Sequence, residues 1–218
     1  MSNEYTGDVT RGGTPAVRDL GGGLTLTKVS VGPMDNNAYL LRAGTEQLLI
    51  DAANDAGTLL ALAGESGLRT VVTTHRHQDH WVALAEVVQA TGAASLAHTD
   101  DAPEIPVVTA TLSDGDTVEV GGHTLEVIHV VGHTPGSVVL AYRDPGGRAH
   151  LFTGDSLFPG GVGNTRKNKR NFESLINDVE HKLFDRFGDD TWFYPGHGKD
   201  STLGAERSHL PEWRARGW

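Results

Sequence analysis

The densest group of potential metal ligands in the sequence is the stretch TTHRHQDH at residues 73–80. Three histidines and one aspartate lie there within six positions, from His75 to His80. Alternate side chains of an extended backbone point to the same side, so His75 and His77 can bind one ion. Asp79 and His80 then face a neighbouring position. The competing interpretation is a solvated turn before a helix, in which Asp79 caps the helix N-terminus.

Three further stretches supply donors of the same kind. His133 lies in GHTPGS, Asp155 in TGDS and His197 in PGHG, and each stretch follows an apolar segment typical of a strand. Glycine or proline flanks each donor, which allows the backbone to come close to a buried group. All the donors are nitrogen or oxygen, and the sequence contains no cysteine. The set therefore suits zinc, manganese or iron and excludes thiolate sites.

These four motifs, in this order, resemble those of the metallo-β-lactamase superfamily, and GHTPGS and GDSLF are most similar to its glyoxalase II-like (hydroxyacylglutathione hydrolase) branch. The resemblance covers about Leu24 to His197. It implies an α/β fold, a four-layer αββα sandwich with the metal site at one edge of the two sheets. Asp51, which follows the apolar LLI, matches the first motif of the family, an aspartate that steadies the ligand loop.

Carried over residue by residue, the resemblance implies a binuclear centre with two divalent ions. The matching residues form two sets with Asp155 as the bridge between them: His75, His77 and His133 for the first ion, and Asp79, His80 and His197 for the second. Zinc is the first expectation, with manganese and iron as alternatives. Asp79 and Asp155 would also orient a metal-bound hydroxide.

Such a centre predicts a metallo-hydrolase. Two ions that share a water lower its pKa toward neutrality, and the resulting hydroxide attacks an acyl carbonyl whose oxyanion one ion stabilises. An acyl thioester of the hydroxyacyl-thiol class is favoured over an amide, because the other ion can receive a thiolate.

Other functions stay open at this point. A mononuclear iron persulfide dioxygenase shares the fold of this branch, and a lactonase or β-lactamase differs from a thioesterase only in the shape of the pocket. The complete second ligand set favours hydrolysis. A closed structural zinc site usually has four ligands and no open position, so the larger donor set here argues against one.

A basic cluster follows GDSLF at Arg166, Lys167, Lys169 and Arg170. Our hypothesis is that Arg166 and Lys167 bind the anionic part of a substrate. A solvated loop before a helix explains the cluster equally well. Asn164 stands where similar enzymes carry a basic residue.

The composition limits the partners. The formal net charge of −10 argues against nucleic-acid and anionic-membrane surfaces. No segment approaches the roughly 20 apolar residues of a membrane span, and the N-terminal residues lack the apolar core of a secretory signal. We expect a soluble cytoplasmic enzyme that acts on a small-molecule substrate, with its oligomeric state left open.

Short strands and a few helices must position these motifs. Residues 1–22 are expected to be a flexible lead-in, and residues 23–218 a single metallo-hydrolase domain. The patterns predict strands at 24–31, 37–43, 46–52, 69–74, 93–98, 116–120, 123–131, 137–143, 149–155 and 191–196. They predict helices at 55–66, 81–92 with Gly92 as the C-cap, 172–187, and around 202–209. Trp213 and Trp218 are expected to anchor the end of the chain in the core. The remaining histidines carry no ligand spacing and receive no role: His98, His123, His129, His150, His181 and His209.

Overall fold

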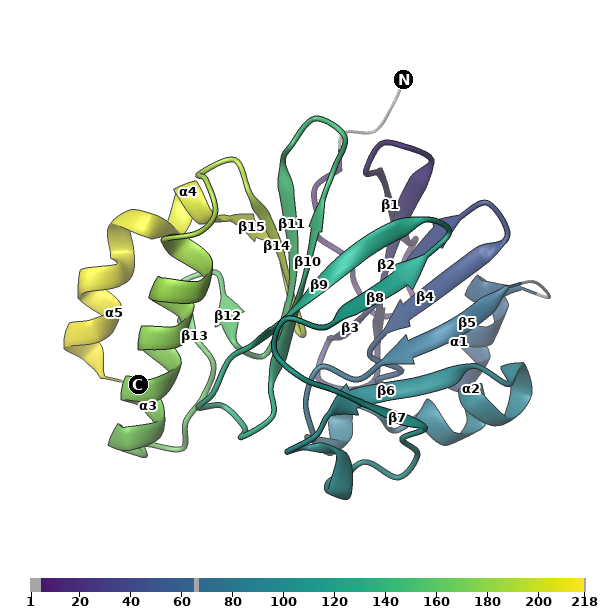
Figure 1. Ribbon diagram of the computed structural model, residues 1–218, viewed down its shortest axis with the longest axis horizontal. Helices are drawn as coiled ribbons and strands as arrows, with labels where there is room; N and C mark the ends of the chain where they lie inside the picture. The colour runs from purple at the N-terminus through teal and green to yellow at the C-terminus, as the bar shows by residue number, and fades with distance from the viewer. Residues whose placement is uncertain (1–4, 65–66, 218) are drawn as a thin grey trace.

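Two large β-sheets form the centre of the computed structural model, which describes residues 5–64 and 67–217 (Figure 1). The first sheet has seven strands that lie in chain order. They are β1 (Ala16–Asp19), β2 (Leu24–Val31), β3 (Asn36–Ala43), β4 (Glu46–Ile50), β5 (Leu68–Val72), β6 (Ala94–His98) and β7 (Ala110–Leu112). Strands β1 to β4 form an antiparallel meander, and β4 to β7 run parallel to one another.

The second sheet has six strands in the order β15-β14-β11-β10-β9-β8. They are β8 (Thr117–Val120), β9 (His123–His129), β10 (Val138–Arg143), β11 (Ala149–Gly154), β14 (Trp192–Pro195) and β15 (Ser201–Thr202). All neighbours are antiparallel except β11 and β14, which are parallel. A small hairpin of β12 (Leu157–Phe158) and β13 (Gly161–Val162) follows β11.

Helices cover the outer face of each sheet (Figure 1). On the first sheet lie α1 (Ala56–Ala63) and α2 (Leu84–Thr91), which connect the parallel strands β4, β5 and β6. On the second sheet lie α3 (Lys169–Asp178), its π-helical continuation η3 (Val179–Phe184), α4 (Leu203–Glu206) and α5 (Leu210–Arg216). Short 3₁₀ turns occur at η1 (Gln78–His80), η2 (Ala102–Glu104) and η4 (Arg207–His209).

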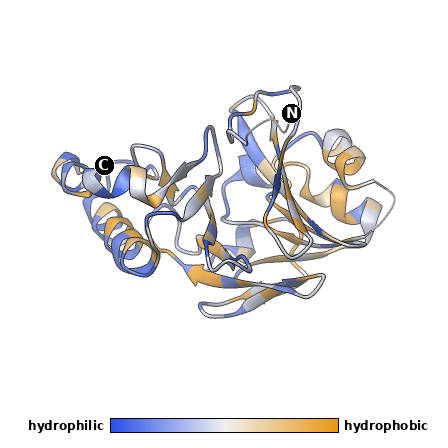
Figure 2. Ribbon diagram, turned by 90° about the horizontal axis from the view of Figure 1, so that it is seen from above, coloured by the Kyte–Doolittle hydropathy of each residue, from blue (hydrophilic) through white to orange (hydrophobic). Residues whose placement is uncertain are grey.

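Three apolar clusters correspond to the three interfaces between these four layers. Leu41, Val127 and Phe152 belong to the cluster between the two sheets. Leu59 belongs to the cluster under α1 and α2, and Leu175 to the one under α3 and η3. Figure 2 shows the hydrophobic residues along the strands and on one side of the flanking helices. Burying a leucine side chain stabilises the fold by about 1.5–3 kcal/mol, so each interface adds to the stability of the sandwich.

Strand β4 is buried on both faces, which explains its continuous run of apolar residues. Leu48 and Ile50 face the cluster between the sheets, whereas Leu49 faces the helices. Successive side chains of a strand point to opposite faces, and both faces of this sheet are covered. A strand in that position needs a continuous apolar run rather than an alternating one. The predicted α/β class with an αββα sandwich is confirmed.

The lead-in differs from the prediction where it is described. Residues Ala16–Asp19 form β1, which pairs antiparallel with β2. Tyr5 packs edge to face on Trp192, with ring centroids 6.0 Å apart. An edge strand of four residues that alternates half-buried and exposed positions is too short to leave a pattern in the sequence. Residues 1–4 lie outside the described part of the chain.

The helices begin and end close to their predicted positions. Helix α1 ends at Ala63, before the undescribed residues 65–66. Helix α3 begins earlier than predicted, because the Asn168 side chain accepts a hydrogen bond from the Asn171 N–H. Trp213 is buried against Phe184, as predicted, and Trp218 lies outside the described residues. Within residues 5–64 and 67–217, no helix is both long and apolar enough to cross a membrane.

Candidate metal centre

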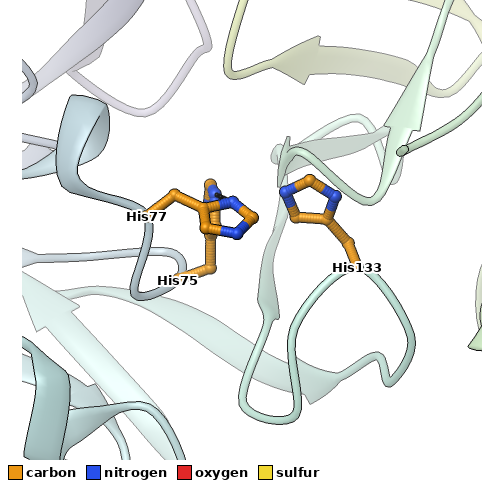
Figure 3. Close-up of side chains that lie close together, drawn as sticks. All are labelled: His75, His77 and His133. Atoms are coloured by element: carbon orange, nitrogen blue, oxygen red, sulfur yellow. Dashed lines mark hydrogen bonds between the residues drawn. The ribbon is translucent and has the colours of Figure 1, made fainter. Parts of the chain in front are cut away.

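Four strand ends bring the predicted donors together at one edge of the sandwich. His75 follows β5, His133 follows β9, Asp155 follows β11 and His197 follows β14. The side chains of His75 and His77 point toward that of His133 from a separate loop (Figure 3). Carboxyl ends of strands are where ligands collect in layered α/β proteins.

The first group of donors consists of three histidines. His75 Nε2 lies 3.1 Å from His77 Nδ1. The ring of His133 lies 4.9 Å from that of His75 and 4.5 Å from that of His77, measured between centroids. One nitrogen from each residue lies within 4.8 Å of the other two. Two nitrogens bound to one zinc at about 2.1 Å are roughly 3–3.5 Å apart, and the pair formed by His75 and His77 already has that separation.

The second group consists of Asp79, His80 and His197. The Nε2 atoms of the two histidines lie 3.2 Å apart, and Asp79 Oδ2 lies 3.4 Å from His80 Nε2 and 3.3 Å from His197 Nε2. Asp79 does not cap α2, whose N-cap is Ala83. The interpretation of TTHRHQDH as a capped turn is therefore wrong.

Asp155 lies between the two groups. Its Oδ1 atom is 3.4 Å from His80 Nε2, and its Oδ2 atom is 3.6 Å from His133 Nε2 and 3.5 Å from His197 Nε2. One carboxylate thus reaches donors of both groups, which is the geometry that a bridging ligand needs.

Hydrogen bonds on the outer side of the rings fix the tautomer of three histidines. The Nδ1–H groups of His80, His133 and His197 donate to Asp51 Oδ2 at 2.8 Å, to the Asn164 carbonyl at 2.9 Å and to the Met34 carbonyl at 2.9 Å. Each Nε2 atom therefore faces the centre. Such partners orient metal-bound histidines and raise their basicity.

Asp51 also holds the loop that carries the first two histidines. It is 2% exposed, and its carboxylate accepts hydrogen bonds from the backbone N–H and the hydroxyl of Thr74, at 2.7 and 2.8 Å. The Thr74 oxygen in turn lies 3.1 Å from His75 Nδ1, which leaves His75 Nε2 for the centre. Asp51 adopts a left-handed backbone with φ of 60°. Non-glycine residues in this conformation are concentrated at functional sites.

Two buried atoms in the centre lack a hydrogen-bond partner. Neither His133 Nε2 nor Asp155 Oδ1 makes a hydrogen bond to any residue that the structure describes. Leaving a buried polar atom unpaired costs about 1–3 kcal/mol. A cation bound by nitrogen and oxygen donors would satisfy both atoms, so the residues present fit a divalent metal.

Burial keeps the first group neutral. It lowers the pKa of His75 well below its ordinary value, and His80 adds to this effect. Burial and the neighbouring His133 lower the pKa of His77 to about 4, and burial lowers the pKa of His133 as well. At neutral pH these three rings carry lone pairs that are free to bind a cation.

In the second group, nearby carboxylates outweigh burial and raise the pKa values of the histidines. Burial by itself lowers the pKa of His197, but hydrogen bonds to Asp155 and Asp79 outweigh it and raise the pKa to about 10. Burial likewise opposes the charge on His80, yet Asp155 and Asp51 raise its pKa well above the ordinary value. Without a metal, these two histidines hold protons that a cation must displace.

Glycines allow the loops to approach so closely. A Cβ atom on Gly196 would lie 2.3 Å from Asp155 Oδ1 and 2.6 Å from the Cε1 atom of His80. A Cβ atom on Gly163 would lie 1.8 Å from the Asp155 carbonyl oxygen. Steric clashes therefore explain why glycine occupies these positions near the predicted donors.

Asn36 is a supporting residue that the sequence interpretation missed. Its Nδ2 atom donates to the carbonyl and the Oδ2 atom of Asp79, both at 2.9 Å, and its backbone bridges to that of His197. The sequence signal was the pair Asn36 and Asn37 directly before the apolar residues 38–41, and the structure leaves both side chains 1% exposed. Buried polar pairs of this kind need partners.

A further group, made of His98, Asp100 and His129, also brings three donor atoms within 4.8 Å of one another. The two imidazoles stack at 3.9 Å with an angle of 19° between their planes. Because nitrogen lone pairs lie in the ring plane, stacked rings present them in parallel, and they do not converge on one ion. The remaining histidines make structural or local contacts: His123 with Tyr142, His150 with Tyr194, His181 with Asp185 and His209 with Glu212.

Arg166 and Lys167 lie in the loop between β13 and α3. Both are exposed and adopt left-handed backbones, with φ of 54° and 60°. The Arg166 N–H donates to the Asn164 side chain, and the Asn164 carbonyl holds His133. Lys167 and Asn164 line a cavity of about 1110 Å³ between this loop, α3 and α5. The loop thus joins the predicted basic residues to the metal centre and to an adjacent cavity.

Comparisons with known proteins agree with this geometry. The family model of the Metallo-beta-lactamase superfamily matches residues 31–205. A hydroxyacylglutathione hydrolase of Fuscovulum blasticum is 40% identical over 132 residues, which are 59% of this chain and 51% of that protein. The chain thus spans about half the length of that curated relative.

Two solved structures extend the likeness to the whole fold. ETHE1 from Myxococcus xanthus is 25% identical with a TM-score of 0.75, over 87% of this chain and 84% of that one. TTHA1623, solved in a di-iron-bound form, is 30% identical with a TM-score of 0.68, over 83% of this chain and 96% of that one. The chain belongs to the metallo-beta-lactamase superfamily.

Proposed function

We propose that the protein is a binuclear metal-dependent hydrolase that cleaves an acyl thioester of the hydroxyacyl-thiol class. The observation that carries the proposal is the position of Asp155 between two complete three-residue groups of donors, with its Oδ1 atom buried and without a hydrogen bond. A mononuclear site would leave the second group without a function.

The residues that would hold the ions follow from the two groups. His75, His77 and His133 would hold the first ion, and Asp79, His80 and His197 the second, with Asp155 shared. Zinc suits this set of imidazole and carboxylate donors, and manganese or iron are the alternatives. When bound, the two ions would lower the pKa of water toward neutrality and polarise an acyl carbonyl.

The carboxylates of the chain would orient the attacking water. Burial opposes the charge on Asp155, but His80 and His197 hold its pKa well below the ordinary value. The hydrogen bond with His197 has the same effect on the pKa of Asp79. Both groups therefore stay ionised and can accept a hydrogen bond from a water molecule in the centre. A separate protein base is then not required.

The products follow from the atoms involved. The oxygen of water forms the new bond to the acyl carbon, the carbon–sulfur bond breaks, and the thiolate leaves with its electron pair. One proton of the water ends on the thiol, and the carboxylic acid product releases the other to solvent. The similarity to a hydroxyacylglutathione hydrolase supports a thioester in preference to an amide.

The cavity beside Asn164 is the proposed place for the remainder of the substrate. Its volume of about 1110 Å³ is sufficient for a small organic ligand. Phe172 and Ile176 give it an apolar wall, and Lys167 and Lys169 give it positive charge. We propose that Arg166 and Lys167, in the loop between β13 and α3, bind the anionic part of the substrate.

The test begins with metal content. Protein purified without added metal or chelator should contain close to two ions per chain, as a binuclear site requires. It should hydrolyse members of a panel of acyl thioesters, with lactones and a β-lactam as comparison substrates. Removal of the ions should abolish the activity, and zinc should restore it. One iron per chain, together with oxygen uptake on addition of a persulfide, would overturn the proposal in favour of a dioxygenase.

A further inference from the structure

The three histidines of the first group come from two loops that belong to different sheets. His75 and His77 lie on the loop after β5 in the first sheet, and His133 lies on the loop after β9 in the second. Strand pairing within a sheet therefore does not set their separation. One backbone hydrogen bond, from Val138 N–H to the Thr74 carbonyl at 2.9 Å, joins the two sheets nearby.

Asp101 provides a second and more extensive link between these loops. It follows β6 and has a fully buried side chain. Its Oδ2 atom accepts the Arg76 backbone N–H at 2.9 Å and the Thr134 hydroxyl at 2.6 Å. Its Oδ1 atom accepts the Gly136 N–H at 2.8 Å. Arg76 lies between His75 and His77 in the chain, and Thr134 directly follows His133.

We infer that Asp101 is a positioning residue that sets the location of His133 relative to His75 and His77. It touches no donor atom of the centre, so it acts through the backbone on either side. The inference rests on the metal centre proposed above.

The packing around Asp101 supports a dedicated role. A Cβ atom on Gly136 would lie 2.6 Å from the Asp101 nitrogen and 2.8 Å from its Cγ atom, so only glycine allows this approach. The Arg76 side chain also reaches toward Asp101, with Nε 3.9 Å from Oδ1, while its guanidinium pairs with Glu104. A buried carboxylate is costly unless it is fully hydrogen-bonded, and here the hydrogen bonds come from both histidine loops.

A carboxylate offers two acceptor oxygens and so matches these donors. Three N–H and O–H groups point at the two oxygens. An asparagine offers one oxygen, and its NH₂ group must then face another donor. Asp101→Asn therefore keeps the shape of the side chain but breaks the link on one side.

The experiment measures metal binding directly. Apo-protein is titrated with zinc against a chromophoric chelator, for the wild type, Asp101→Asn and the control Asp100→Asn. The control removes the same charge from the neighbouring position, where the exposed Asp100 side chain approaches His98. We expect the control to match the wild type. Asp101→Asn should lower the affinity for one of the two ions by about 10- to 100-fold, which is the range for residues that support metal ligands.

A double-mutant comparison identifies which ion is affected. Adding Asp101→Asn to His133→Ala should not lower the affinity for that ion any further, because the two substitutions disrupt the same group of ligands. The inference is overturned if Asp101→Asn lowers the affinity for both ions equally, or if it leaves both affinities at the wild-type value. It is also overturned if the effects of the two substitutions on affinity add in the double mutant. A wild type that holds fewer than two ions overturns the proposed centre instead, and the inference with it.

A second variant covers the case in which Asp101→Asn does not fold. Thr134→Val removes the hydroxyl that bonds both Asp101 and the Ser137 hydroxyl, and Thr134→Ser retains it. Thr134→Val should lower the affinity for the same ion, and Thr134→Ser should bind that ion with an affinity close to that of the wild type. Equal affinities in these two variants count against the inference.

Discussion

Gly196 is the position where the smallest addition should disturb the centre most. Its φ is not in the left-handed region, so Gly196→Ala introduces a steric change rather than a backbone strain. The added methyl group would lie 2.3 Å from Asp155 Oδ1 and 2.6 Å from the Cε1 atom of His80. An ordinary contact is about 3.4 Å or longer, so the Asp155 carboxylate must move by about 1 Å.

The magnitude follows from that displacement. Overpacking of this kind costs about 1–3 kcal/mol of folding stability. A misplacement of about 1 Å at a reacting centre costs on the order of 100-fold in rate. Because both contacted residues belong to the second group or bridge to it, the second ion should be lost first. Zinc titration, kcat/KM on the best thioester and the thermal midpoint measure the three effects.

Gly198→Ala is the matched control in the same loop. Gly198 has φ of 70°, and among the described residues no atom lies within 4 Å of the place that its methyl group would take, so the substitution brings strain without contact. We expect a stability loss of roughly 1–2 kcal/mol with both ions retained. A Gly196→Ala protein with wild-type metal affinity and wild-type kcat/KM would refute the steric reasoning.

Three further predictions concern protons, charge and packing. At neutral pH the raised pKa values of His80 and His197 mean that loading the second ion releases about two protons, which calorimetry in buffers of different ionisation enthalpy will detect. As the pH falls below about 10, the pKa of His197, affinity for the second ion should drop by up to about 100-fold per pH unit. Affinity for the first ion, bound in part by His77 with its pKa of about 4, should change little in the same titration. Reversing the charges of Arg166 and Lys167 to glutamate should raise KM and leave kcat similar; an unchanged KM in steady-state kinetics means that the loop does not bind substrate. Trp213→Ala should lower the free energy of unfolding by about 3–5 kcal/mol in denaturant melts, because the ring is 1% exposed and packs on Phe184.

The local spacing of donors was readable from the sequence because it depends on short stretches. TTHRHQDH places its ligands within one loop, and the glycines and prolines around His133 and His197 mark turns after apolar strands. The continuous apolar run of β4 likewise indicates a strand buried on both faces. Residue chemistry and periodicity therefore determined the donor set and most of the strands, whereas the layered αββα class was implied by the resemblance to the superfamily.

Contacts between distant residues were decided by the tertiary structure alone. Asn36 reaches Asp79 across 43 positions, and Asp101 reaches Thr134 across 33. Neither contact leaves a periodic signal, because hydrogen-bond partners of a buried side chain depend on where two loops meet. The same holds for the stacked rings of His98 and His129, whose spacing in the chain implied nothing.

The sequence by itself determined which atoms are able to bind metal and that they follow strand ends. The tertiary structure decided which of them share a group, which tautomer each histidine adopts and how far the loops stand apart. The physical reason is that donor chemistry belongs to single residues, whereas position and protonation depend on burial and on the charges that other elements bring within reach.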